Sequence, residues 1–210
     1  MTANEPELLA HHFSEAGLAG QSCHYRMRAG ERAVSRAAYS EAIAHFSMGL
    51  KEAEKLRDAA ERMRRKLDFL LKLGPALMVT HGMQSAKAED VYKEAEQIGT
   101  AASNAEATFK AKWGLWLTAN IAQKSALARD RAQDLVAFAR RFGESDLLLE
   151  AYHCRWSTAI FRGDVKETIE NGRIGAPRLT TSIGTAIAGT LLAATTRAFA
   201  RVACAHWRIR

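Results

Sequence analysis

The chain has 210 residues, of which 48% are apolar and 25% charged, so it can bury a core and is not disordered throughout. It holds only three prolines, which disfavours a turn-rich β sandwich and favours helices. The N-terminus carries Glu5 and Glu7 and no basic segment, so a secretory signal is not expected. Cys23, Cys154 and Cys204 are widely spaced, which predicts free thiols in a cytoplasmic protein.

The net charge of +7 is unevenly distributed along the chain. Residues 171–210 contain six arginines and no acidic residue, which leaves 24 basic and 23 acidic residues in 1–170. A basic excess over a folded domain would indicate a nucleic-acid partner. Because the excess belongs to the C-terminal 40 residues, the sequence does not predict nucleic-acid binding.

The N-terminal part predicts four helices. The first two are expected from a cap at Asn4 to about Ala16, and from near Ala19 with a weak point at Gly30. Apolar residues three and four apart predict the third, at Tyr39, Ala42, Ile43, Phe46, Leu50 and Ala53. Asp58 is a candidate cap of the fourth, which Gly74–Pro75 is expected to kink or end.

Four further segments have helical periodicity, and none shows the alternation of a β-strand. Their expected limits are Ser85 to Gly99, Asn104 to about Ile121, a segment ending at Gly143, and Ser145 or Asp146 to Gly163. The sequence therefore predicts an all-α fold.

Three segments share an aromatic residue, a small turn residue and a small residue within the following helix: Phe13–Ser22, Tyr39–Phe46 and Phe161–Ile169. The small residue, for example Ala42, lets a partner helix approach, and Phe46 one turn later fills the space between repeats. This pattern resembles the second helix of tetratricopeptide repeats. It predicts antiparallel helix pairs stacked as a tetratricopeptide-like solenoid over residues 1–170.

A more specific resemblance covers roughly residues 6–170. It is carried by Pro6–Leu18, Arg28–Ala33, Tyr39–Phe46, Leu73–Leu77 and Trp113–Leu117, which occur in that order. These motifs resemble the repeat region of bacterial signalling proteins in which a class III adenylate/guanylate cyclase is fused to a predicted P-loop ATPase. The resemblance implies a cytoplasmic regulatory or scaffolding segment.

The chain departs from that family because it has no G-x-x-x-x-G-K-[ST] phosphate loop and no strand to carry the metal-binding aspartates of a cyclase. We therefore expect a non-catalytic interaction or scaffold module without a cofactor, a truncated remnant of such a regulator. Two alternatives stay open. The chain could associate with a separately encoded cyclase or ATPase, or it could be a tail-anchored membrane adaptor.

Several residue groups suggest a site but are interpreted as structural. His11 and His12 point about 100° apart on a helix, and His11 with Glu15 supplies only two metal ligands. Cys23–His24 and His153–Cys154 fail for the same reason. The aromatic residues Trp113, Trp116 and Trp156 are expected in the core. A basic cluster is expected on a solvated helix face, where Glu61 can pair with it: Arg62, Arg64, Arg65 and Lys66.

Tetratricopeptide arrays bind peptides or partner helices in a groove lined by the first helix of each pair. In that register Lys112, Asn120 and Arg155 are the candidate partner-binding residues. The expected partner is a protein or peptide, whereas a membrane partner is not favoured.

Residues 171–210 differ from the rest of the chain, with nine alanines, six threonines and six arginines. Their uncharged run Leu179–Thr196 has 18 residues, near the lower limit for a membrane span, but its threonines and glycines make it weakly apolar. This composition favours a frame-disrupted remnant over a membrane anchor. We expect this segment to lie outside the repeat domain.

Overall fold

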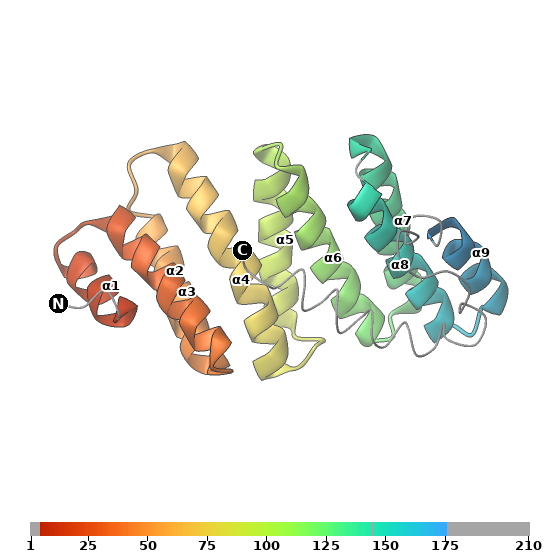
Figure 1. The fold of residues 1–210 in the computed structure, drawn as a ribbon, viewed down its shortest axis with the longest axis horizontal. Helices are drawn as coiled ribbons and strands as arrows, with labels where there is room; N and C mark the ends of the chain where they lie inside the picture. Colours follow the sequence, from red (N-terminus) through yellow and green to blue (C-terminus); the bar gives the residue numbers. More distant parts are fainter. Residues whose placement is uncertain (1–4, 144, 176–210) are drawn as a thin grey trace.

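The computed structural model describes residues 5–143 and 145–175, and this part of the chain consists of helices joined by short turns, with no strand (Figure 1). The helices of the described residues are α1 (Pro6–Glu15), α2 (Ala19–Ser35), α3 (Tyr39–Ala53), α4 (Ala59–His81), α5 (Ala86–Ala101), α6 (Ala105–Ile121), α7 (Ser125–Phe142), α8 (Ser145–Phe161) and α9 (Val165–Gly175). The all-α prediction is confirmed.

Four helix starts and ends that were predicted from capping residues agree with the structure. The side-chain oxygens of Asp58, Ser85 and Asn104 accept hydrogen bonds from backbone N–H groups in the first turns of α4, α5 and α6. Gly143 ends α7 in the left-handed conformation, with φ of 68°. Each of these residues satisfies backbone groups that a helix end leaves unpaired.

Two expected helix ends were wrong, since α4 does not end at Gly74–Pro75 and α5 does not end at Gly99. The cap of α1 is Glu5, without a side-chain cap bond; the candidate cap Asn4 lies outside the described residues. Helix α4 continues through Pro75 to His81, and α5 continues beyond Gly99. Gly99 is a close-contact position, since a Cβ there would lie 2.8 Å from Oγ1 of Thr108 on α6.

One type of turn joins five of the helix pairs. In each, a residue with positive φ follows the helix, and the next N–H bonds to the carbonyl five residues earlier at 2.9–3.0 Å. The N–H of the positive-φ residue itself bonds to the carbonyl three residues earlier at 2.9–3.1 Å. These two bonds form the Schellman arrangement, which closes a helix C-terminus and turns the chain back. The positive-φ residues are Gly17, Ala37, Ser103, Gln123 and Gly163.

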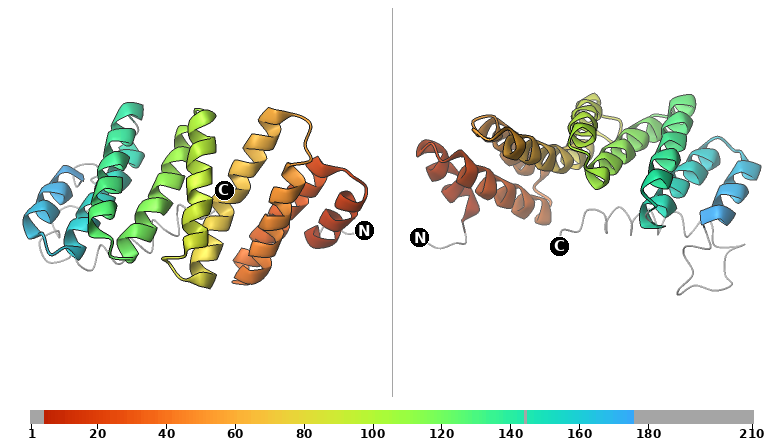
Figure 2. Two further views of the ribbon diagram at one scale, coloured as in Figure 1. Left: turned by 180° about the vertical axis from the view of Figure 1, so that it is seen from behind. Right: turned by 90° about the horizontal axis from the view of Figure 1, so that it is seen from above.

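Successive helices pack against each other in chain order, and the row of helices curves along the molecule (Figure 2). The even-numbered helices make additional contacts: α2 with α4, α4 with α6, and α6 with α8. We call α2, α4, α6 and α8 the inner layer. The predicted partner-binding residues Lys112, Asn120 and Arg155 lie on α6 and α8 of this layer.

Aromatic rings pack onto helical glycines between the layers. A Cβ at Gly30 would lie 2.2 Å from the ring of Phe46, and one at Gly49 would lie 2.2 Å from the ring of Phe69. Gly30 therefore does not interrupt α2. It lets the ring of α3 touch the backbone of α2, and that contact offsets the roughly 1 kcal/mol that a glycine costs in a helix.

Replacing Ala42 by leucine should destabilise the fold by about 1–3 kcal/mol, because Ala42 is fully buried in α3 and extra methyl groups would overpack the core. The free energy of unfolding in urea measures this cost. Ala44→Leu is the matched control, since Ala44 is exposed on the same helix and should change stability by less than about 0.5 kcal/mol. Equal values for the two variants would contradict the predicted helix pairing.

The C-terminal limit of the repeat domain stays a prediction. Helix α9 continues to Gly175, beyond the expected limit at residue 170, and Asn171 within it is buried. Most of the Arg/Ala/Thr-rich segment, including the run Leu179–Thr196, lies outside the described residues. Within the described part of the chain, no helix has the length and apolar character that crossing a membrane requires.

Candidate functional site

A buried aromatic and polar cluster joins α6 to α8 in the inner layer. Nε1 of Trp113 donates to Oε1 of Glu150 at 2.6 Å, and Nδ1 of His153 lies 3.1 Å from the same oxygen. Nε1 of Trp116 donates to Oγ1 of Thr158 at 2.9 Å. The prediction that Trp113 and Trp116 are core residues is confirmed, because their exposed fractions are 5% and 0%.

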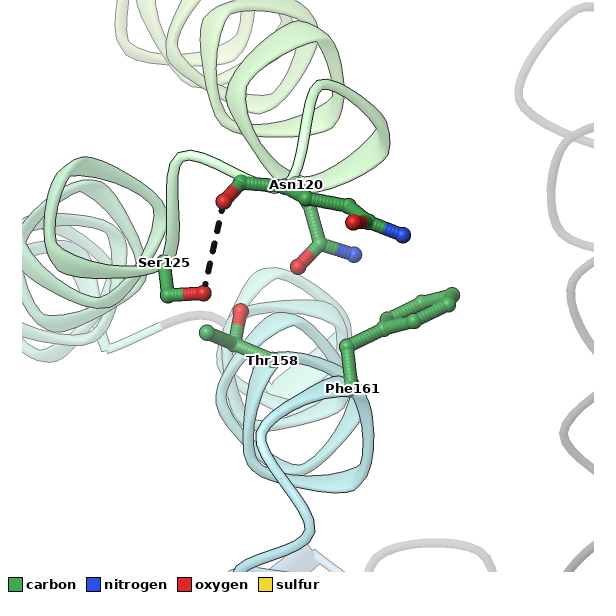
Figure 3. Close-up of a pocket in the computed structure, with 5 residues that line it drawn as sticks. Asn120, Ser125, Thr158 and Phe161 are labelled. Atoms are coloured by element: carbon green, nitrogen blue, oxygen red, sulfur yellow. Dashed lines mark hydrogen bonds between the residues drawn. The ribbon is translucent and has the colours of Figure 1, made fainter.

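A pocket of about 160 Å³ opens next to this cluster, between the C-terminal ends of α6 and α8 and the start of α7. Asn120 and Ser125 lie on one side of it and Thr158 and Phe161 on the other, with Gln123 completing the lining (Figure 3). All five lining side chains are uncharged.

Two lining residues have features that their place in the fold does not require. Asn120 is 3% exposed, and its Nδ2 atom is buried without a hydrogen-bond partner. Leaving a buried donor unpaired costs about 1–3 kcal/mol. Phe161 is 61% exposed although it is a large apolar side chain at the end of α8. The hydroxyl of Thr158, by contrast, accepts from Trp116 and donates to the carbonyl of Cys154.

The other two predicted partner-binding residues are held by ion pairs. Nζ of Lys112 lies 2.6 Å from Glu96 on α5 and 2.5 Å from Asp134 on α7. Burial disfavours the ammonium, but hydrogen bonds to Asp134 and Glu96 outweigh it and raise the pKa of Lys112. Nη2 of Arg155 lies 3.3 Å from Glu167 on α9. The structure thus places only Asn120 of the three in the pocket lining.

The described residues hold no cluster of three or more His, Cys, Asp or Glu side chains that could bind a metal ion. Burial raises the pKa of the Cys23 thiol to about 11 and also raises the pKa of Cys154. Thiols in this state are poor nucleophiles near neutral pH, because the thiolate is the reactive form. Both are interpreted as packing residues.

Three residues of the basic cluster of α4 are paired with carboxylates, and the fourth, Arg62, donates to the backbone carbonyl of Leu56 at 2.6 Å. Arg64 and Arg65 bind Glu61, and Lys66 lies 2.6 Å from Glu54 on the preceding turn and 3.4 Å from Glu94 on α5. These pairs fit the interpretation of the cluster as a solvated helix face.

A second polar cluster lies between α2 and α3. Nη1 of Arg26 is 3.5 Å from Nδ1 of His45, and Nε2 of His45 is 3.8 Å from Oε1 of Glu41. Burial lowers the pKa of His45, the charge of Arg26 lowers it further, and Glu41 and Glu7 oppose the change. The neutral imidazole is therefore the form that the fold favours.

Because the pKa of His45 is lower in the folded than in the unfolded chain, protonation favours unfolding. Stability should be unaffected above the unfolded pKa of about 6.5 and should decrease as the pH falls below it. His45→Asn, which does not titrate, should reduce this decrease in the free energy of unfolding. His11→Asn is the control, since His11 is exposed. Identical pH profiles for wild type and His45→Asn would contradict the prediction.

No protein-family profile matches the chain. Among curated proteins, the uncharacterized protein R02095 of Rhizobium meliloti (strain 1021) is 29% identical over 162 residues, which are 76% of this chain and 16% of that protein. The chain therefore spans about a sixth of the length of this relative.

Among solved structures, the crystal structure of a Rap protein complexed with competence and sporulation factor is similar, with a TM-score of 0.59 and 15% sequence identity. The similarity covers 77% of this chain and 43% of the Rap chain. The chain has a tetratricopeptide-like helical solenoid fold. At this level of identity the likeness concerns the fold alone, so the role of any residue rests on its own geometry.

Sequence reasoning placed Asn120 in the candidate groove but missed Ser125, Thr158 and Phe161. Ser125 begins α7, and Thr158 and Phe161 lie near the end of α8. These helix ends come next to Asn120 of α6 through the turn at Gln123 and the packing of α6 on α8. The exposed Phe161 was part of a repeat motif in the sequence, and nothing in its spacing indicated that it lines a pocket.

Proposed function

We propose that this chain is a non-catalytic helical-repeat module that binds a protein or peptide segment on its inner layer. One observation carries the proposal: the pocket between α6 and α8 brings a buried, unpaired amide donor and an exposed aromatic ring to the same place. A packed core normally pairs its hydrogen-bond donors and covers its aromatic rings. A site that has an unpaired donor beside an exposed ring therefore indicates a binding role.

Selection from a displayed library of random 12-residue peptides on the immobilised full chain tests this proposal. We expect enriched peptides whose binding shifts the backbone amide resonances of α6 and α8. Shifts confined to α3 and α5, outside the inner layer, would contradict the proposed surface. Failure to enrich any peptide over an unrelated helical protein would contradict the function itself.

The proposal extends to the origin of the module. We propose that it derives from a cyclase/ATPase-type cytoplasmic regulator and that it has no nucleotide chemistry of its own. The motifs over residues 6–170 support this origin, and so does the similarity to a longer relative, of which the matched residues make up 16%. The purified chain should show no metal-dependent ATP hydrolysis or cyclic-nucleotide formation above a mock purification. An ATPase or cyclase activity that co-purifies with the protein would contradict the proposed absence of nucleotide chemistry.

We also propose that Lys112 and Arg155 bind an acidic part of the partner. Its carboxylates would replace Asp134 beside Lys112 and Glu167 beside Arg155. Lys112→Gln and Arg155→Gln should then weaken the binding of acidic peptides more than that of neutral ones. Equal effects on both classes of peptide would remove these residues from the site.

We also propose that residues 176–210 lie outside the repeat fold. Deleting them should change the free energy of unfolding by less than about 0.5 kcal/mol, as expected away from packed features. This deletion keeps α9 and the buried Asn171. A larger loss of stability would show that the segment packs on the solenoid.

A further inference from the structure

The pocket between α6 and α8 has a chemistry that narrows the class of its partner. Its lining contains two carboxamides, two hydroxyl groups and one aromatic ring, and no charged side chain: Asn120, Gln123, Ser125, Thr158 and Phe161. A charged ligand group would lose its hydration in this pocket without gaining an opposite charge. A neutral group that accepts a hydrogen bond avoids this cost.

The donor that such a group would meet is Nδ2 of Asn120. The residue is 3% exposed, and its Nδ2 atom is buried and has no hydrogen-bond partner. The hydroxyl of Thr158 already donates to the carbonyl of Cys154. Asn120 therefore brings to the pocket a buried donor that the fold leaves unused, and an acceptor entering the pocket would remove the cost of leaving it unpaired.

The aromatic ring at the pocket supplies the second requirement. Phe161 is 61% exposed and lies across the pocket from Asn120 (Figure 3). A ring in this position can cover an apolar side chain that is next to the bound carbonyl group. An extended polypeptide offers this combination, because each residue carries a neutral backbone carbonyl beside its side chain.

We infer that the pocket binds an uncharged, extended peptide segment, with a backbone carbonyl oxygen accepting from Nδ2 of Asn120 and an adjacent apolar side chain packing on Phe161. This inference rests on the proposed peptide-binding function and specifies its chemistry. Asn120 acts as a binding residue, and its amide is not needed for the stability of the fold.

The test uses the full chain and a synthetic peptide of the tightest-binding sequence from the library selection. Asn120→Leu, which keeps the size of the side chain and removes the donor, should weaken binding about tenfold, and Phe161→Ser should have a comparable effect. In the wild type, the side-chain amide resonances of Asn120 should shift on titration with the peptide.

Stability measurements separate binding from structure. Asn120→Leu should be as stable as the wild type or more stable, because it removes an unpaired buried donor. Asn171→Leu is the matched control: Asn171 is equally buried, but its Nδ2 donates to the carbonyl of Glu167 at 2.8 Å. This control should lose stability while keeping its affinity for the peptide.

Three results would overturn the inference. A peptide with a charged residue in place of the apolar residue that packs on Phe161 could bind as tightly as the selected one, or the affinity could be unchanged in Asn120→Leu. In both cases the peptide-binding function itself would stand. Failure of the library to yield any binding peptide would instead contradict the function and the inference together.

Discussion

Tyr92→Ala is expected to destabilise the protein by about 3–5 kcal/mol, as truncation of a fully buried aromatic residue does in other cores. The ring of Tyr92 on α5 contacts the backbone of two inner-layer helices. A Cβ at Gly74 on α4, or at Gly114 on α6, would lie 2.5 Å from its ring atoms. Removal of the ring would leave a cavity between three helices, and urea denaturation measures the loss.

Two further variants identify the cause of this loss. Gly114→Ala keeps the ring but leaves no room for it, and it should cost about 1–3 kcal/mol through overpacking. Val79→Ala on α4 is the control, since Val79 is 55% exposed and its truncation should cost less than about 0.5 kcal/mol. If Tyr92→Ala cost no more than Val79→Ala, the ring would not join α4 to α6.

The existence and type of the helices, and the three side-chain caps, could be predicted from the sequence because they depend on nearby residues. Asp58, Ser85 and Asn104 cap the helices that follow them, and each bond spans only two or three residues. The apolar spacing from Tyr39 to Ala53 likewise matched α3 at both ends. In these segments local preference and tertiary packing favour the same structure.

The recurring turn could not be found in this way. Its left-handed residue is glycine at two of the five positions, and the others are Ala37, Ser103 and Gln123. A search for Gly at helix C-termini therefore misses three of the five turns. Gly30 had the opposite effect: it suggested a weak point in α2, whereas its partner is the ring of Phe46 on another helix.

The candidate site was predictable only in part for the same reason. Asn120 follows from repeat register, but its unpaired donor depends on what surrounds it in three dimensions. The position of Lys112 in the repeat predicted a partner contact in the same way, but its ammonium is paired with Glu96 and Asp134 from two neighbouring helices. Register places a residue on a helix of the inner layer. The residues of adjacent helices decide whether its polar group is unpaired or must first leave an ion pair to bind a partner.

Trp116→Ala should also destabilise the protein by about 3–5 kcal/mol, since the indole is fully buried between α6 and α8. Part of this cost belongs to packing and part to the hydrogen bond from Nε1 to Thr158. Trp116→Phe removes the donor and keeps most of the ring. Thr158→Val removes the acceptor at nearly constant size, and it should cost about 1–3 kcal/mol because it leaves Nε1 buried and unpaired.

The double variant Trp116→Phe/Thr158→Val separates the two contributions. Once the donor is gone, loss of the acceptor no longer leaves Nε1 unpaired, so the double variant should be less destabilised than the sum of the single variants, by about 1 kcal/mol. Trp116→Phe combined with Ala44→Leu is the control, because Ala44 lies on α3 and is exposed, and its effect should be additive. Additive effects of the Trp116 and Thr158 changes would show that packing alone, without this hydrogen bond, joins α6 to α8.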